Sequence, residues 1–276
     1  MSIEPSAPMK GRVLIVAGSD SGGGAGIQAD IKTVTALGGY AMTAVTALTA
    51  QNTEGVFGIH DVPPDFVAHQ MRLVLSDIGA DCVKIGMLHM PEIIDAVHGV
   101  LTEAAAGIPV VLDPVMMAKG GHALLTPDAM FSLRNKLIPM AAVLTPNLPE
   151  AEAIAGMDGE LAGEGEGLVR QLLALGPKAV VLKGGHGLGG TVTDLLATAD
   201  GAIEAFESPR IGTPHTHGTG CTLASAIATG IAQGLDVRAA VVRALAYVQE
   251  AIRTAPGLGK GHGPLNHGHT VRSFEG

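Results

Sequence analysis

The chain has 276 residues, and 47% of them are hydrophobic, which is enough for one large domain with an extensive core. Its 17 basic and 26 acidic side chains give a formal net charge of −9. Because the chain is acidic and has no run of lysines or arginines, we expect neither a nucleic-acid-binding surface nor one that binds anionic membranes.

The two cysteines and the N-terminal sequence restrict the class of protein further. Cys82 and Cys221 stand far apart and form no paired-ligand spacing, which argues against a disulfide framework or a structural zinc site. The first nine residues do not resemble a signal peptide, and no apolar run is long enough to span a membrane. We therefore expect a cytoplasmic protein.

Short apolar runs alternate with longer segments of helical periodicity along the chain. Strands are predicted at Arg12–Ala17, Ala41–Thr49, Ala80–Ile85, Pro109–Leu112, Ala141–Leu144, Lys178–Leu182, Gly190–Leu196 and Ala202–Phe206. Helices are predicted at Gly24–Leu37, Pro63–Leu75, Pro91–Ala105, Thr126–Leu137, Asn147–Ala155, Gly167–Leu175, Gly218–Ala232 and Val237–Thr254.

This alternation predicts an α/β fold with a mostly parallel sheet that helices cover on both faces. No change in composition marks a second domain, so we expect residues 1–276 to form one domain, with flexible tails at 1–10 and 268–276. The glycine-rich acidic stretch 156–167 is predicted to be a surface connection. Ligands bind such folds at the carboxyl ends of the strands.

A glycine-rich loop, Gly18–Gly26, follows the first predicted strand. It contains neither a dinucleotide-binding nor a P-loop motif, so it is either a tight turn or the backbone wall of a small-molecule pocket. Asp30, on the following helix, could accept hydrogen bonds from a polar ring. Gln51 and Asn52 end the next strand, where an amide can bind a heterocycle edge or simply cap the strand.

Three further strand ends carry charged or polar side chains. Asp113 could hold Mg²⁺, or it could be only a turn residue before proline. Asn147 and Glu150 have the spacing of a helix capping box, and the same two side chains could organise Mg²⁺ and nucleotide phosphates. Lys183 could contact a phosphate, although an ordinary exposed loop lysine is equally compatible with the sequence.

The segment His215–Thr222 carries the strongest chemical signal, because it runs through Gly218, Thr219 and Gly220 directly into a helix. The first turn of a helix offers free N–H donors and a partial positive charge, and glycine lets an anion approach them. Cys221 lies in that turn, where we expect its thiolate to be stabilised, although most free cysteines are buried apolar residues. A cradle of this kind is typical of phosphoryl-transfer enzymes.

Eight motifs in this order resemble the hydroxymethylpyrimidine/phosphomethylpyrimidine kinases, the thiamine-biosynthetic members of the ribokinase superfamily. They lie at Ala17–Thr33, Ala47–Thr53, Lys84–Leu88, Asp113–Met116, Thr145–Ala151, Lys183–His186, His215–Thr222 and Gly259–His267. The resemblance covers about residues 12 to 267. It implies a ribokinase-like αβα sandwich, a homodimer, and two successive ATP- and Mg²⁺-dependent phosphorylations of 4-amino-5-hydroxymethyl-2-methylpyrimidine, giving the diphosphate used for thiamine.

The resemblance also implies roles for individual residues. Gln51 matches the glutamine that binds the aminopyrimidine, and Asp30 matches an acidic residue near it. Met87 and Val115 match residues that line the pocket. Gly218 to Cys221 match the anion hole, and Cys221 stands where many sugar kinases of the superfamily have an aspartate base, so it would orient or deprotonate the hydroxyl. Residues 118–121 match a flap over the substrate.

Two other functions are compatible with the sequence. A pyridoxal kinase resembles this family closely, and its substrate is also a heteroaromatic ring with a hydroxymethyl group, although Gln51 and Met87 favour the aminopyrimidine. A non-catalytic module that binds a small molecule is the second alternative, since a fold does not determine function. The combination of Asp113, Asn147, Glu150 and the Gly218–Cys221 loop argues against it.

Overall fold

A computed structural model describes residues 9–117, 121, 124–156, 165–185 and 189–272. The predicted surface connection at 156–167 and the predicted flap at 118–121 lie mostly outside these residues. A nine-stranded sheet runs through the centre of the molecule in the order β3-β2-β1-β4-β5-β6-β7-β8-β9. Pairing is parallel from β2 through β7, and β3, β8 and β9 are antiparallel to their neighbours.

The strands are β1 (Arg12–Asp20), β2 (Tyr40–Asn52), β3 (Gly55–Asp61), β4 (Cys82–Ile85), β5 (Val110–Leu112), β6 (Val143–Leu144), β7 (Ala179–Leu182), β8 (Thr191–Thr198) and β9 (Ile203–Pro209). The α-helices are α1 (Gly26–Ala36), α2 (Pro64–Asp77), α3 (Pro91–Ala104), α4 (Pro127–Ser132), α5 (Leu148–Ala155), α6 (Glu166–Leu173), α7 (Thr219–Ala232) and α8 (Val237–Arg253).

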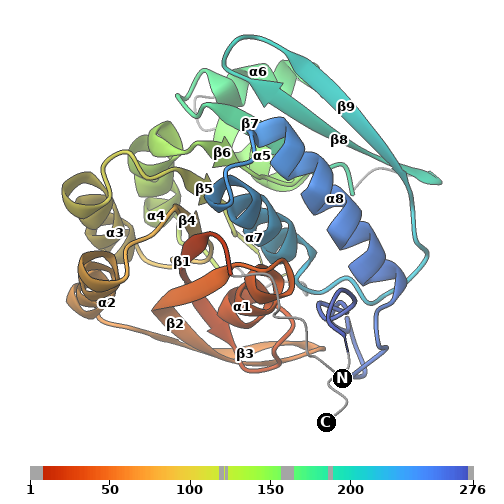
Figure 1. Cartoon of the computed structure of the whole chain (residues 1–276), viewed down its shortest axis with the longest axis horizontal. Coiled ribbons are helices and arrows are strands. Elements are labelled where there is room, and N and C mark those ends of the chain that lie inside the picture. Colours follow the sequence, from red (N-terminus) through yellow and green to blue (C-terminus); the bar gives the residue numbers. More distant parts are fainter. Residues whose placement is uncertain (1–8, 118–120, 122–123, 157–164, 186–188, 273–276) are drawn as a thin grey trace, which may run out of the picture.

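Helices cover the sheet on both faces, as the sequence predicted. One core packs α1, α7 and α8 against the sheet, with Ile15, Val111 and Val181 pointing toward them. Residues of opposite parity, such as Leu14 and Leu112, point into a second core beneath α2 to α6, as expected from the alternation of side chains along a strand. Figure 1 shows α7 and α8 lying together on one face. The predicted three-layer αβα sandwich is therefore confirmed.

The sheet changes direction between β1 and β4. The chain proceeds from β1 outward to β2 and β3, and then returns to place β4 on the other side of β1. At such a switch point the loops after neighbouring strands diverge and leave a crevice at their carboxyl ends. The Gly18–Gly26 and Lys84–Leu88 motifs meet at this crevice.

Three predictions of local structure need correction. Strand β2 runs past the predicted Thr49 and ends at Asn52, in agreement with the placement of Gln51 and Asn52 at a strand end, but its hairpin with β3 was not predicted. Asn52 accepts hydrogen bonds from the amides of Glu54 and Gly55 and so closes the turn. The predicted Thr126–Leu137 helix is α-helical only to Ser132 and continues as a π-helical turn.

The predicted flexible C-terminal tail is also anchored in its described part. The Thr270 hydroxyl donates a hydrogen bond to the carbonyl of Ala36, and the ring of His269 stacks on Tyr247. None of the helices in the described part of the chain is long and apolar enough to cross a membrane.

Candidate active site

A cavity of about 1300 Å³ opens at the carboxyl ends of the parallel strands. Sites for one small molecule usually measure about 300–1000 Å³, so this cavity has room for two ligands side by side. Of the residues predicted to form the site, these line it: Gly18, Gln51, Met87, Asp113, Val115, Asn147, Glu150, Lys183, Gly218, Thr219, Gly220 and Cys221.

The first turn of α7 forms one wall of the cavity. Gly218 precedes the helix with a φ of 83°, a left-handed conformation that suits glycine. A Cβ atom at Gly218 would lie 1.8 Å from the carbonyl oxygen of Gly24, so no larger residue fits between the two loops. Since Gly220 and Cys221 follow in the first turn, their N–H groups have no partner within the helix and can bind an anion. This geometry agrees with the predicted anion hole.

A lysine and an aspartate stand directly beside this turn. Lys183 Nζ lies 2.9 Å from Asp113 Oδ1, and a Cβ atom at Gly220 would lie 3.1 Å from that Nζ. Although burial alone would lower it, the pKa of Lys183 is raised by the carboxylates of Asp113 and Glu150. Lys183 is therefore a fixed cation in the cavity, and the interpretation of it as an ordinary exposed lysine is wrong.

Asn147 and Glu150 form the predicted capping box at the start of α5. The Asn147 side chain accepts from the amide of Glu150 at 2.9 Å, and Glu150 Oε2 accepts from the amide of Asn147 at 2.9 Å. Glu150 Oε2 also lies 3.9 Å from Lys183 Nζ. Burial raises the pKa of Glu150. The helix cap thus holds a carboxylate at the edge of the cavity, so the structural interpretation of this motif is confirmed and the functional one remains compatible with it.

Asp113 and Glu150 were also predicted to bind Mg²⁺. Within the described residues, no three His, Cys, Asp or Glu side chains gather into a protein-only metal site. Mg²⁺ commonly binds through one or two carboxylates and completes its octahedron with water and substrate phosphates. Two buried carboxylates next to an anion-binding helix turn fit that mode of binding.

Another part of the cavity wall is apolar. Met87 and Leu124 pack together with Ala47, and Val115 packs against them. A Cβ atom at Gly18 would lie 3.3 Å from Met87 Sδ, so this glycine leaves open the face above the methionine. The Gln51 side chain lies at the rim, on a strand that its pairing with Val56 holds in place. A flat heteroaromatic ring with a polar edge suits such a site.

A pair formed by the partly exposed His217 and the buried Asp20 joins the glycine-rich loop to the anion-hole loop, and sequence reasoning missed it. Asp20 Oδ2 lies 2.9 Å from His217 Nε2, and the same carboxylate accepts from the amides of Gly22, Gly24 and Ala25. Although burial alone would raise it, the pKa of Asp20 is lowered by the hydrogen bond and charge of His217 and by the amides of Ala25 and Gly22. The only sequence signal was an aspartate inside a glycine-rich turn.

Asp30 does not line the cavity, which corrects its predicted role as a ligand of the substrate. It is fully buried; Oδ2 lies 2.9 Å from Lys84 Nζ, and Oδ1 accepts from the Ser225 hydroxyl at 2.7 Å. Helix α1 turns this side chain inward against α7, so Lys84 lies between it and the cavity that Lys84 lines. Asp30 therefore balances the charge of Lys84 beneath the site.

The predicted stabilisation of a Cys221 thiolate is also wrong. Burial raises the pKa of Cys221 to about 12, and the charge of Lys84 offsets this only in part. The helix N-terminus favours a thiolate in this turn, but the loss of hydration outweighs it, and the carboxylates of Asp30 and Asp113 raise the pKa further. Cys221 is a neutral thiol at pH 7.

The wall beyond Lys183 was not predicted from the sequence. Phe206 and Ile211 face Leu245 and Ile252 of α8 there, and Gln249 and Arg210 add polar groups. These residues come from β9, the segment after it and α8, which carry no recognisable motif. An apolar slot beside the anion hole could hold a nucleobase while its phosphates reach Gly220.

Comparisons with known proteins agree with this geometry. The family model for phosphomethylpyrimidine kinase matches residues 20–266. The chain is similar to the thiamine biosynthesis bifunctional protein ThiED of Geobacter sulfurreducens, with 54% identity over 94% of this chain, but it spans only 52% of that protein. It is 47% identical to a hydroxymethylpyrimidine/phosphomethylpyrimidine kinase of Streptomyces coelicolor, over 93% of this chain and 94% of that protein.

A solved structure shows the same fold. The pyridoxal kinase from Staphylococcus aureus in complex with AMP-PCP and pyridoxal superposes with a TM-score of 0.85 at 32% identity, covering 97% of this chain and 96% of that one. Identity to the pyrimidine kinases is higher, and a family model matches most of the chain. The chain therefore belongs to the phosphomethylpyrimidine kinase family.

Proposed function

We propose that this protein transfers phosphate from ATP to the hydroxymethyl group of 4-amino-5-hydroxymethyl-2-methylpyrimidine, and then to the resulting monophosphate, for thiamine biosynthesis. The convergence of Asp113, Lys183 and the first turn of α7 carries this proposal, because it lies in the middle of a cavity large enough for two ligands. The similarity to hydroxymethylpyrimidine/phosphomethylpyrimidine kinases supports the choice of substrate.

The apolar part of the cavity would recognise a planar ring by its shape and by the side-chain amide of Gln51. Met87 and Val115 enclose an apolar slot beside Gly18. The Gln51 amide offers one acceptor and two donors, so it can pair with an exocyclic amino group and the adjacent ring nitrogen at the same time. Ring binding of this kind would direct the hydroxymethyl group toward Cys221 and the anion hole.

The chemistry requires that the acceptor oxygen attack the terminal phosphorus while the bond to ADP breaks. Enzymes accelerate this step mainly by alignment and by stabilising charge on the transferred group. Here the N–H groups of Gly220 and Cys221 would bind the equatorial oxygens, and Lys183 would neutralise charge between donor and acceptor. Mg²⁺, held by Asp113 and Glu150 together with the phosphates, would supply further positive charge.

Cys221 then contacts the acceptor hydroxyl of the substrate rather than deprotonating it as a strong base. A thiol with a pKa of about 12 is almost entirely protonated at neutral pH. It can lie against the hydroxyl and orient it, and phosphoryl transfer through a loose transition state needs little assistance from a base. In the second step the acceptor is a phosphate monoester, which is largely ionised at pH 7 and has no proton to remove.

The first experiment is product analysis by mass spectrometry. The purified protein is incubated with ATP, Mg²⁺ and either hydroxymethylpyrimidine or pyridoxal, with Asp113→Asn as the matched variant. We expect mono- and then diphosphorylated pyrimidine, strongly reduced by the substitution. Pyridoxal phosphate as the only efficient product would reassign the enzyme to pyridoxal, which the likeness to the pyridoxal kinase makes the second candidate. Pyrimidine binding without ADP release would indicate a non-catalytic module.

We also propose that the protein is a homodimer and works in the cytoplasm, where ATP is supplied. The β2–β3 hairpin at the sheet edge supports dimerisation, because Leu48 and Phe57 are 49% and 73% exposed there. Light scattering of the wild-type protein and of Phe57→Ser tests the dimer, and a monomeric wild-type protein would contradict it.

A further inference from the structure

The C-terminal motif Gly259–His267 belongs to the family resemblance, yet no step of the proposed reaction uses it. After α8 the chain leaves the helix and crosses the end of the molecule as an irregular segment, which we call the strap (residues 257–267). The strap contacts two loops that border the cavity and the first turn of α7.

One end of the strap is hydrogen-bonded to the tip of the β2–β3 hairpin. The carbonyl of Thr53 accepts from the amide of His262 at 2.8 Å, and the Thr53 hydroxyl accepts from the amides of Lys260 and Gly261 at 3.1 and 3.2 Å. A Cβ atom at Gly261 would lie 2.2 Å from the Thr53 carbonyl oxygen, so the two backbones are in direct contact. Thr53 follows Gln51 by two residues, and the strap therefore fixes the hairpin that carries Gln51.

The middle of the strap holds the anion-hole loop. The amide of His217 donates to the carbonyl of Gly263 at 3.1 Å, and His262 Nδ1 lies 3.0 Å from the carbonyl oxygen of Pro214. A Cβ atom at Gly263 would lie 2.5 Å from the ring of His215. These contacts set the path of the chain immediately before Gly218.

The last residue of the strap reaches α7 itself. His267 is only 4% exposed, and its Nε2 lies 3.0 Å from the hydroxyl oxygen of Thr222. That hydroxyl also donates to the carbonyl of Gly218 at 2.8 Å. The other ring nitrogen donates to the backbone carbonyl of Leu265, so the neutral ring carries its proton on Nδ1. Nε2 is then an acceptor, and the hydroxyl proton of Thr222 is shared between the carbonyl of Gly218 and His267 Nε2.

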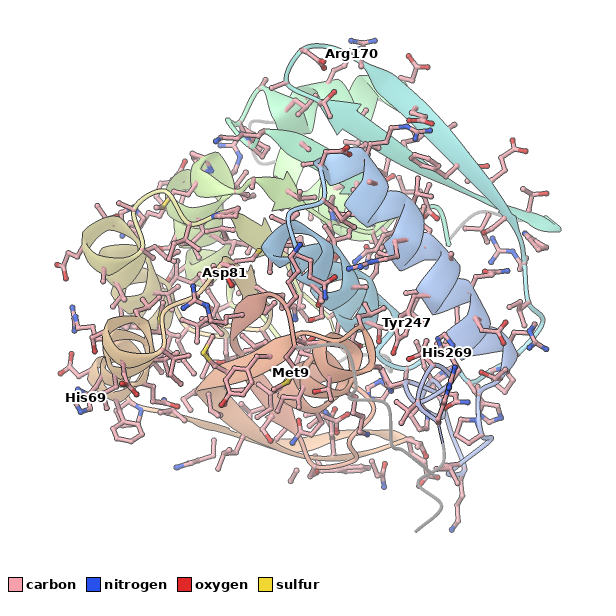
Figure 2. The ribbon with its side chains drawn as sticks, viewed as in Figure 1. Met9, His69, Asp81, Arg170, Tyr247 and His269 are labelled. Atoms are coloured by element: carbon pink, nitrogen blue, oxygen red, sulfur yellow. The ribbon has the colours of Figure 1, made fainter. Side chains whose placement is uncertain are left out.

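His267 itself is held from the opposite side by α8. The hydroxyl of Tyr247 donates to the backbone carbonyl of His267 at 2.6 Å. Figure 2 shows Tyr247 close to His269, and the two rings stack with centroids 4.6 Å apart. Burial lowers the pKa of His267 to about 4, so the ring is neutral under working conditions.

We propose that His267 is a positioning residue for phosphoryl transfer, acting through Thr222 on the carbonyl of Gly218 and so on the orientation of the N–H groups in the anion hole. Gly218 is the left-handed residue at which the loop enters α7, and a rotation of its peptide planes would misalign the adjacent amides. The inference rests on the proposed kinase function.

The test compares His267→Leu and Thr222→Val with the conservative variants His267→Gln and Thr222→Ser. Losing one hydrogen bond in this chain should lower kcat about tenfold, while KM for the pyrimidine and for ATP changes less than about twofold. The double variant His267→Leu/Thr222→Val should be no slower than the worse single variant, because both break the same chain. His267→Gln and Thr222→Ser should recover most of kcat.

His269→Leu is the control, because the contacts of His269 lie beside the strap, on the ring and the backbone carbonyl of Tyr247. It should lower thermal stability and leave kcat unchanged. If His269→Leu lowers kcat as strongly, or if the effects of His267→Leu and Thr222→Val multiply, the loss is general destabilisation and the proposal is wrong.

A readout that does not depend on turnover separates failure of this proposal from failure of the proposed function. The ¹⁵N NMR signals of His267 should show a neutral ring protonated at Nδ1 at pH 7, and Thr222→Val should shift the resonance of the unprotonated Nε2. An Nε2 resonance that Thr222→Val leaves unchanged would overturn the inference, even in a protein without kinase activity. A wild-type protein that has the expected tautomer but forms no product would instead contradict the kinase function.

Discussion

Removing the Cys221 sulfur tests whether this thiol takes the proton of the substrate hydroxyl. We consider Cys221→Ala, with Cys221→Ser as the matched variant. A pKa of about 12 leaves roughly one thiolate in 10⁵ molecules at pH 7, because each pH unit below the pKa reduces the ionised fraction tenfold. An obligatory thiolate base would therefore make kcat rise about tenfold per pH unit across the neutral range.

We expect a different result, because the neutral thiol orients the acceptor. Cys221→Ala should lower kcat by less than about tenfold, the size of a lost contact, and Cys221→Ser should restore most of it. Both phosphorylations should slow by similar factors. Between pH 7 and 9 the ratio of wild-type to Cys221→Ala kcat should stay constant.

The assay follows each step separately in single-turnover quench experiments, starting from the hydroxymethylpyrimidine or from its monophosphate. Only the first acceptor carries a hydroxyl proton, so only the first step can depend on a base. The reasoning is refuted if the logarithm of the first-step rate rises with unit slope against pH and Cys221→Ala abolishes this slope while the second step is unaffected. In that case the thiolate is the base.

Three further predictions concern groups around the cavity. Lys84→Met should lower the free energy of unfolding by about 3–5 kcal/mol, because it leaves the buried Asp30 carboxylate without its cation. In urea titrations the double variant Lys84→Met/Asp30→Asn should recover much of this loss. An equal loss in the single and double variants would contradict the ion pair. Gln51→Ala should raise KM for the pyrimidine about tenfold and leave KM for ATP within twofold in steady-state assays, and an unchanged pyrimidine KM would exclude Gln51 from recognition. The lowered pKa of Asp20 means that its bond to His217 stabilises the fold fully above the unfolded pKa of about 3.9 and progressively less as the pH falls through the lower folded value. Asp20→Asn should therefore reduce stability at pH 7, and its difference from wild type should shrink as the pH falls below the unfolded pKa of about 3.9 and through the lowered folded pKa. A loss of constant size across this range would have another cause.

Local sequence signals predicted most of the fold because they act within a few residues. The capping box Asn147–Glu150 defines the start of α5 by hydrogen bonds three residues apart, and the prolines at the starts of α2 and α3 do the same through fixed φ angles. The β2–β3 hairpin escaped prediction because its turn has no Asn-Gly or Asp-Gly pair and β3 is an exposed edge strand with little apolar alternation.

Sequence reasoning located those parts of the site where a charged residue directly follows a predicted strand. Asp113 and Lys183 follow different strands, and a parallel sheet brings such ends to the same edge, where they lie 2.9 Å apart. Asp30 was misplaced because the sequence places it on α1 but does not show which side of α1 faces Lys84. The apolar wall of Phe206, Ile211 and Leu245 carried no signal, since such residues are equally at home in a core.

The sequence by itself thus determined the alternating α/β architecture, the glycines that allow two loops to meet, and the order of the motifs along the chain. Only the tertiary structure decided the charge states and partners: that Cys221 is a neutral thiol, that Asp20 holds His217, and that His267 reaches Thr222 across 45 residues of sequence. Burial and long-range contacts fix these properties, and both arise only when distant segments pack together.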